Sequence, residues 1–274
     1  MIDRTLKIRI LPTESGNMNY WYESLAVAQR ILIELVRRRR SLILWVIFPL
    51  SLLSINSLVV SEQGQIPVSQ ALSLIAPSAL IGSALFFSCL GGTVATIVAE
   101  REHLTLKRLF LSPLSGLSYF LGIFIAHSCI GLGQTLLVYT SAMLWGANFQ
   151  GNFLLVLAII LLSIISYVGM GFVLSTQLAK RTEDVNSIVA AFGIPLLILG
   201  GAFFPTSFFP KILLQLAEFN PVYHMNEALV GVSNNGDSLR EIGRHFKFLV
   251  VFAAITLGTA WFSYNRMLKS EKRL

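Results

Sequence analysis

Side chains that could perform catalysis are few and scattered in this 274-residue chain. Nucleophilic and metal-dependent catalysis need a base or a ligand set within reach, and the sequence contains no GxSxG, SxxK, HExxH or CxxC motif. Carboxylates scattered through a polar stretch are usually solvated. We therefore predict that the chain is not an enzyme, although four of its carboxylates could form a lipid- or sugar-modifying site: Glu218, Glu227, Asp237 and Glu241.

Three other reactive side chains lie inside apolar stretches. Cys89 and Cys129 are too few for a disulfide framework, and no Cys/His cluster has the spacing of a metal site. We interpret both cysteines as small buried hydrophobic residues. His127 could sense pH or bind a substrate. A lone histidine among helices more often forms a hydrogen bond to a neighbouring helix, and this is the state we expect.

The most informative group of charges lies between residues 99 and 117, where the sequence reads AEREHLTLKRLFLSPLSGL. It predicts a short amphipathic helix that ends or bends at Pro113. Such a helix can rest on a bilayer or dock in a groove of a soluble partner, and composition does not choose between the two. The chain has no GxxxxGK[ST] loop, so it does not bind ATP by that route.

The elements that hold these residues are those of a membrane protein. Apolar residues make up 54% of the chain and charged residues 13%, against about 25% charged residues in soluble proteins. The net charge of +7 would suggest nucleic acid in a soluble protein. Here the basic residues flank apolar stretches, so we predict contacts with membrane lipids and none with nucleic acid.

Six stretches are long and apolar enough to cross a bilayer: 41–60, 71–99, 117–145, 153–178, 185–204 and 246–264. Their cores lack the charges that usually mark ion or proton pathways. Lys and Arg are concentrated before the first stretch, after the second and fourth, and near the C-terminus. This bias predicts two cytoplasmic termini and a bacterial inner (plasma) membrane, although a plastid membrane would give the same pattern.

The predicted fold is an all-α polytopic membrane protein in four segments. Residues 1–18 form a flexible tail, 19–40 an amphipathic helix on the inner membrane surface, 41–268 the six-span domain and 269–274 a cytoplasmic tail. The apolar stripe predicted for the surface helix repeats at steps of four and three residues: Trp21, Leu25, Ala28, Leu32 and Leu35.

Between the fifth and sixth spans lies an outer segment rich in aromatic residues and proline. It contains Pro205 and Pro210, then a short apolar run, then Asn220 and Pro221, which break the run. Two short apolar helices joined by such a break predict a re-entrant hairpin, partly inserted from the outer side. The alternative is a cap packed on the ends of the spans.

This order of elements resembles the permease subunits of class-two ATP-binding-cassette (ABC) exporters, in the drug-exporter-like branch. The proline-rich outer segment looks like that family's re-entrant hairpin. Leu104 stands where the family usually carries Gly, so the local turn need not be the same. The charged loop looks like the family's first coupling segment at Glu100, Arg101, Glu102, Thr105, Leu106, Leu109 and the run Ser112, Pro113, Leu114 and Ser115.

The resemblance implies that the chain has no ATPase of its own. ATP and Mg would bind two copies of a separate nucleotide-binding subunit, and the permease would pair with a second copy of itself. The cargo would be hydrophobic or amphipathic (a drug, lipid or glycoconjugate). The surface helix, the coupling helix and the loop after the fourth span would meet the ATPase. This assigns coupling roles to Glu100, Arg101, Glu102, Thr105, Leu106, Lys107, Arg108, Leu109, Lys180, Arg181, Glu183 and Asp184.

Two other functions remain open at this point. An ATP-independent carrier or channel would need an ion site inside the membrane, which the sequence does not show. A membrane enzyme or an assembly scaffold is the other possibility. The enzyme would form product alone in detergent, and the scaffold would bind partners without turnover.

Overall fold

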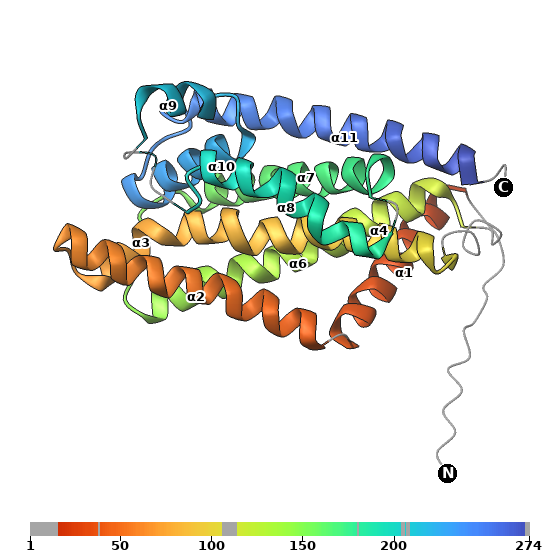
Figure 1. Ribbon diagram of the computed structural model, residues 1–274, viewed down its shortest axis with the longest axis horizontal. Coiled ribbons are helices and arrows are strands. Elements are labelled where there is room, and N and C mark those ends of the chain that lie inside the picture. Colours follow the sequence, from red (N-terminus) through yellow and green to blue (C-terminus); the bar gives the residue numbers. More distant parts are fainter. Residues whose placement is uncertain are drawn as a thin grey trace, which may run out of the picture.

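A computed structural model describes residues 16–37, 39–105, 114–179, 181–203, 206 and 209–271. Every regular element in these ranges is a helix, and the long helices run side by side in one bundle (Figure 1). The start of α1 and the end of α11 lie at the same end of this bundle. The helices are α1 (Gly16–Arg37), α2 (Arg39–Gly64), α3 (Val68–Ala79), η1 (Leu80–Gly91), α4 (Gly92–Glu102), α6 (Gly116–Leu144), α7 (Phe153–Gln177), α8 (Thr182–Leu199), α9 (Lys211–Ala217), α10 (Pro221–Val230), η3 (Gly231–Asn235) and α11 (Gly243–Glu271).

Six helical stretches in the described ranges are long and apolar enough to cross a membrane: Arg39–Gly64, Val68–Glu102, Gly116–Leu144, Phe153–Gln177, Thr182–Leu199 and Gly243–Lys269. They confirm the predicted all-α polytopic fold and the number of spans. The stretch Val68–Glu102 consists of α3, η1 and α4 and is longer than the predicted second span. It is also the most buried of the six, because α2, α6, α7 and α8 all pack against it.

The middle of this central stretch, η1, is a π-helix. Pro77 lies in the turn before it and has no N–H to donate. Within it, Ser83 and Ser88 donate their hydroxyls to the carbonyls of Ala79 and Ala84, four residues earlier. These hydroxyl bonds occupy carbonyls that an α-helix would use for its own N–H groups, which favours the wider i→i+5 pairing.

The predicted surface helix, α1, packs on α6 through a face that includes part of the predicted stripe: Ala28 is buried, and Leu32 and Leu35 are partly buried against the core. Its buried residues are Ser24, Val27, Ala28 and Ile31, whereas Trp21 and Leu25 are 62% and 52% exposed. The contact is close because α6 carries Gly122 there, and a Cβ at that position would lie 2.6 Å from the Val27 side chain. The predicted stripe is therefore wrong at Trp21 and Leu25, whereas Ala28, Leu32 and Leu35 pack inward as predicted.

The interior residues singled out in the sequence have mixed outcomes. His127 is buried in α6 and bonds to neighbouring helices as expected, with Nδ1 3.1 Å from the carbonyl oxygen of Ser88 and Nε2 3.4 Å from the hydroxyl of Thr96. Cys89 is buried, but Cys129 is exposed on the surface of the bundle, so its expected burial was wrong. Cys129 therefore lies on the outward face of α6.

At the end of the bundle away from α4, the short helices α9 and α10 follow α8 (Figure 1). Pro210 is the N-cap of α9, and Asn220 is the N-cap of α10, with Pro221 at its first position. Asn220 accepts a hydrogen bond from the Val222 N–H at 3.0 Å and donates to the Leu196 carbonyl of α8 at 2.6 Å. This asparagine therefore both starts α10 and joins it to the fifth span. Pro205 lies outside the described residues.

Candidate coupling site

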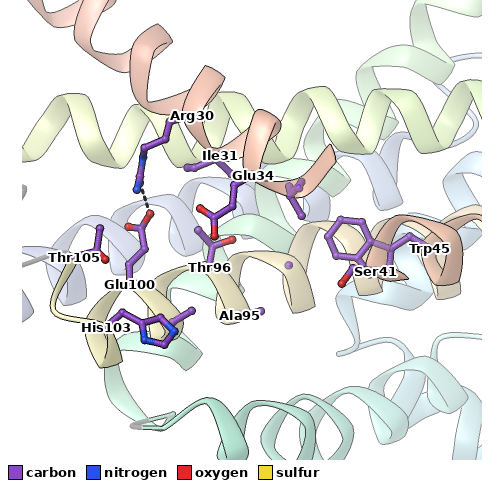
Figure 2. A pocket seen from close by; sticks show the side chains of 13 residues that line it. Arg30, Ile31, Glu34, Ser41, Trp45, Ala95, Thr96, Glu100, His103 and Thr105 are labelled. Carbon is purple, nitrogen blue, oxygen red and sulfur yellow. Dashed lines mark hydrogen bonds and ion pairs between the residues drawn. The ribbon is translucent and has the colours of Figure 1, made fainter. Parts of the chain in front are cut away.

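The end of α4 carries the carboxylate Glu100, which is only 6% exposed. It forms an ion pair with Arg30 of α1, as Figure 2 shows. The Tyr119 hydroxyl of α6 donates a hydrogen bond to the second carboxylate oxygen. Tyr119 in turn stacks on Tyr264 of α11, with ring centroids 5.8 Å apart. A buried carboxylate needs such partners because desolvation of an unpaired charge is costly.

The next residue, Arg101, points to other helices. Its Nη1 donates to the carbonyl of Ala179, just after α7, at 3.2 Å. Its Nη2 lies 2.8 Å from the sulfur of Met267 in α11. The side chain is therefore held between the end of the fourth span and the end of the sixth span.

The third residue, Glu102, reaches the start of α8. Its carboxylate accepts a hydrogen bond from the Thr182 N–H at 2.9 Å and another from the Thr182 hydroxyl. Thr182 is the first residue of α8, where a negative charge is also favoured by the helix dipole. Glu102 thus fastens the second span to the beginning of the fifth.

These three consecutive residues form what we term the α4 contact set (Glu100, Arg101 and Glu102). Successive side chains of an α-helix point about 100° apart, so each member meets a different neighbour. Together they contact α1, α6, the segment after α7, α8 and α11. A displacement of the α4 end would therefore move all these helices together.

Beside this contact set lies a cavity of about 130 Å³ between α1, α2 and α4 (Figure 2). Arg30, Glu34 and His103 supply charged or titratable side chains to it, and Trp45 closes it toward α2. Ligand pockets usually have volumes of about 300–1,000 Å³. This cavity is thus too small for a cargo molecule and has room only for water or a small ion.

Comparison with known proteins identifies the family of this chain. The sequence model of the ABC-2 type transporter family matches residues 22–233, which is most of the chain. The chain belongs to the ABC-2 type transporter family. It is also 21% identical over 193 residues to the probable multidrug ABC transporter permease YbhS of Escherichia coli, in strain K12 and in O157:H7. That match covers 69% of this chain and 50% of YbhS, so the chain spans about half the length of these curated relatives.

In this ABC-2 family member, the predicted coupling residues fall into two described groups. Glu100, Arg101, Glu102 and Thr105 lie at and just after the end of α4. Arg181, Glu183 and Asp184 lie at the start of α8, where Asp184 accepts a hydrogen bond from the Arg181 N–H at 3.1 Å. The Glu102–Thr182 bonds bring the two groups together. Leu106, Lys107, Arg108, Leu109 and Lys180 lie outside the described residues.

The turn after α4 keeps a conformation that usually requires glycine. Leu104 has φ of 56°, in the left-handed region. This is the position at which the family pattern carries Gly, and an L side chain there is strained by its Cβ. The leucine side chain is 57% exposed, so packing does not compensate for the strain.

Sequence reasoning missed the partners of the α4 contact set. Arg30, Tyr119 and Thr182 were not singled out from the sequence. One signal was present: a carboxylate that directly follows a long apolar run needs a cation or hydroxyl partner if the run is buried. The sequence does not say which of the many basic residues provides it.

Proposed function

We propose that this chain is the permease subunit of an ABC exporter driven by ATP hydrolysis on a separate subunit. Two copies of the permease would pair, and two nucleotide-binding subunits would dock at their cytoplasmic face. The observation that carries the proposal is the α4 contact set, which joins the ends of several spans at one point next to the exposed start of α8. Membership in the ABC-2 family supports it.

The physical mechanism is a rigid displacement. ATP and Mg would bind the partner subunits, and their closure would push on the surface formed by the α4 end and the α8 start. Glu102 would pass the push to α8, Arg101 to α7 and α11, and Glu100 to α1 and α6. Packed helices move as units rather than deform continuously, so the spans would shift between inward- and outward-facing arrangements.

The exposed faces of the spans support a hydrophobic or amphipathic cargo and a path between two copies. The first and fifth spans expose large apolar side chains: Ile43, Leu44 and Ile47 on α2, and Phe192 and Ile194 on α8. With cytoplasmic termini in a bacterial inner membrane, α4 would lie at the inner face and α9 and α10 at the outer face, where they would form the re-entrant hairpin.

The direct test is purification from the native membrane in mild detergent, followed by identification of the proteins that remain bound. An ABC ATPase subunit at a one-to-one ratio supports the exporter assembly. A monodisperse preparation without any ATPase contradicts it. That result would favour an ATP-independent carrier or channel, a membrane enzyme or a scaffold, and the residues after α4 would then rest on lipid.

A further inference from the structure

A second cavity, of about 430 Å³, lies at the end of the bundle opposite the α4 contact set. We term it the outer cavity. Its walls come from the last turns of α2, the second half of α3, the segment after α8 and one face of α10. These belong to the first and second spans, to the segment that directly follows the fifth span, and to α10. In the proposed exporter, the first, second and fifth spans would line the transport path between the two copies. The volume is within the usual range of small-molecule sites.

The walls of the outer cavity are largely apolar, with a few polar groups. The apolar side chains are Val60, Leu74, Ile75, Ala202, Phe203 and Val230. The polar side chains are Asn56, Gln63, Ser78, Thr206, Asn226 and Glu227. Glu227 is the one ionisable residue among the described residues that line it. A mixed apolar wall with few polar groups is typical of a site for an amphipathic molecule.

Most of the polar groups are already occupied by one another. The Ser78 hydroxyl donates to Asn226 at 2.9 Å, and the Asn226 amide donates to the Gly201 carbonyl at 3.3 Å. The Thr206 hydroxyl donates to Oε1 of Glu227 at 2.7 Å. Within the described part of the chain, the second oxygen of Glu227 and the amide of Asn56 have no hydrogen-bond partner.

We propose that the outer cavity binds the cationic headgroup of an amphipathic cargo, an organic ammonium or related cation, through Glu227. The free carboxylate oxygen would face the cation, Asn56 would accept a hydrogen bond from it, and the apolar wall would hold the attached rings or chains. A single carboxylate beside an apolar wall attracts a cation and repels an anion. The proposal rests on the permease function above and specifies its cargo class.

The test uses the full chain in lipid nanodiscs without an ATPase. The probe is tetraphenylphosphonium, and the comparison ligand is tetraphenylborate, which has the same shape and the opposite charge. Empty nanodiscs give the background from partition into lipid. We expect saturable binding of the cation above this background, and no saturable binding of the anion.

Substitution of Glu227→Gln is the decisive variant. The Gln side-chain carbonyl can still accept the Thr206 hydrogen bond, so the fold is expected to persist. Loss of the charge should weaken binding of the cation by about tenfold. Glu227→Asp keeps the charge and should retain most of the affinity. The matched control is Glu62→Gln, which removes an exposed carboxylate at the end of α2 and should leave binding unchanged.

Each outcome is decisive for the outer cavity. Equal binding of the cation and anion, or unchanged affinity in Glu227→Gln, overturns the proposal. Equal loss in Glu227→Gln and Glu62→Gln also overturns it, because it would reflect overall surface charge. If the Gln variant is not monodisperse, Glu227→Met, which also removes the charge, replaces it and should likewise weaken cation binding. Because binding is measured without the partner, failure here leaves the ATPase docking experiment unaffected.

Discussion

At the α4 end of the bundle, charged side chains make the buried contacts between helices, whereas at the α10 end most of the buried contacts are made by neutral side chains. Glu100 and Arg101 are held by ionic and hydroxyl contacts across several helices. At the other end the joins are made by Asn220, Asn226 and the pair His224 and His245. The ion pair between Arg244 and Glu218 there is exposed on both sides and contributes little.

The difference indicates two mechanical roles. A buried carboxylate that loses its partner is strongly destabilising, so the α4 end is expected to keep its contacts through the transport cycle. A neutral hydrogen bond contributes a net of about 1 kcal/mol and can be exchanged for another. Under the proposed mechanism, the α10 end would rearrange when a path opens, while the α4 end would transmit the motion that opens it.

The largest expected effect comes from Glu100→Ala. The substitution leaves Arg30 and Tyr119 without their shared partner, so we expect the unfolding free energy to fall by about 2–3 kcal/mol, below the full cost of a buried pair because the Arg30 side chain is 35% exposed. Equilibrium unfolding in mixed micelles measures this. The control is Glu183→Ala, an exposed carboxylate at the same end, for which no change is expected. If Glu100→Ala and Glu183→Ala were equally stable, the buried contacts of Glu100 would contribute nothing to the stability of the α4 end.

A smaller effect is expected at the outer end from Asn220→Ala. It removes the N-cap of α10 and the bond to Leu196, which should cost about 1–2 kcal/mol in the same unfolding experiment. Asn220→Asp sharpens the result. Aspartate can still accept from the Val222 N–H but cannot donate to the Leu196 carbonyl. A loss in Asp equal to that in Ala would assign the whole effect to the bond between α10 and α8.

The pair of His224 and His245 predicts that acid lowers the stability of the α10 end and leaves that of the α4 end unchanged. His224 lies 2.9 Å from the Glu218 carbonyl through Nε2 and 2.9 Å from Nδ1 of His245 through its own Nδ1. In the neutral pair, His224 donates to the carbonyl and accepts from His245. A proton added to Nδ1 of His224 would bring its N–H against the Nδ1–H of His245, so the hydrogen bond would be lost. The positive charge of Arg244 also disfavours a charged His224.

Burial lowers the pKa of His224 from its ordinary value of 6.5, with His245 and Arg244 acting in the same direction. The unfolded chain therefore binds more protons as pH falls, so this contribution to stability is complete above about pH 6.5 and is lost as pH drops toward the folded pKa. We expect thermal stability to decline as pH falls below about 6.5 toward pH 5.5, and to decline less in His224→Gln. His103→Gln, at the inner end, should follow the wild type. A His103 variant that resists acid as well would contradict the assignment.

The smallest effect is expected from Leu104→Gly. Relief of the left-handed strain is worth about 1–2 kcal/mol, and the greater freedom of glycine in the unfolded chain offsets up to about 1 kcal/mol. We expect a net gain of roughly 0.5 kcal/mol in unfolding free energy. Leu114→Gly, a leucine on the other side of the loop, serves as the control and should not stabilise. If Leu104→Gly were less stable than the wild type, the Leu104 side chain would have to make a stabilising contact.

Length and hydropathy were sufficient to predict the six spans, because a bilayer imposes both on any helix that crosses it. The resemblance to a family also singled out the residues at the C-terminal end of α4 and at the start of α8 as candidate coupling residues. The partner of Glu100 was not predicted, since Arg30 lies 70 residues away and the contact depends on how α1 packs. The close approach of α1 to α6 was not predicted because it depends on Gly122, which has no Cβ. The π-helix was not predicted because it depends on the hydroxyls of Ser83 and Ser88, which compete with backbone N–H groups for the helix carbonyls.

The central claim is that an ATPase subunit docks where the α4 contact set meets α8. A photo-reactive amino acid in place of Glu183, in the native membrane, tests it most directly, with the same amino acid at Glu62 as the comparison. Both side chains are exposed, one at the α8 start and one at the outer end of α2. The account predicts a cross-link to an ABC ATPase subunit from position 183 and none from position 62. A cross-link from position 62, or only lipid adducts from position 183 in a membrane that contains the ATPase, would contradict it.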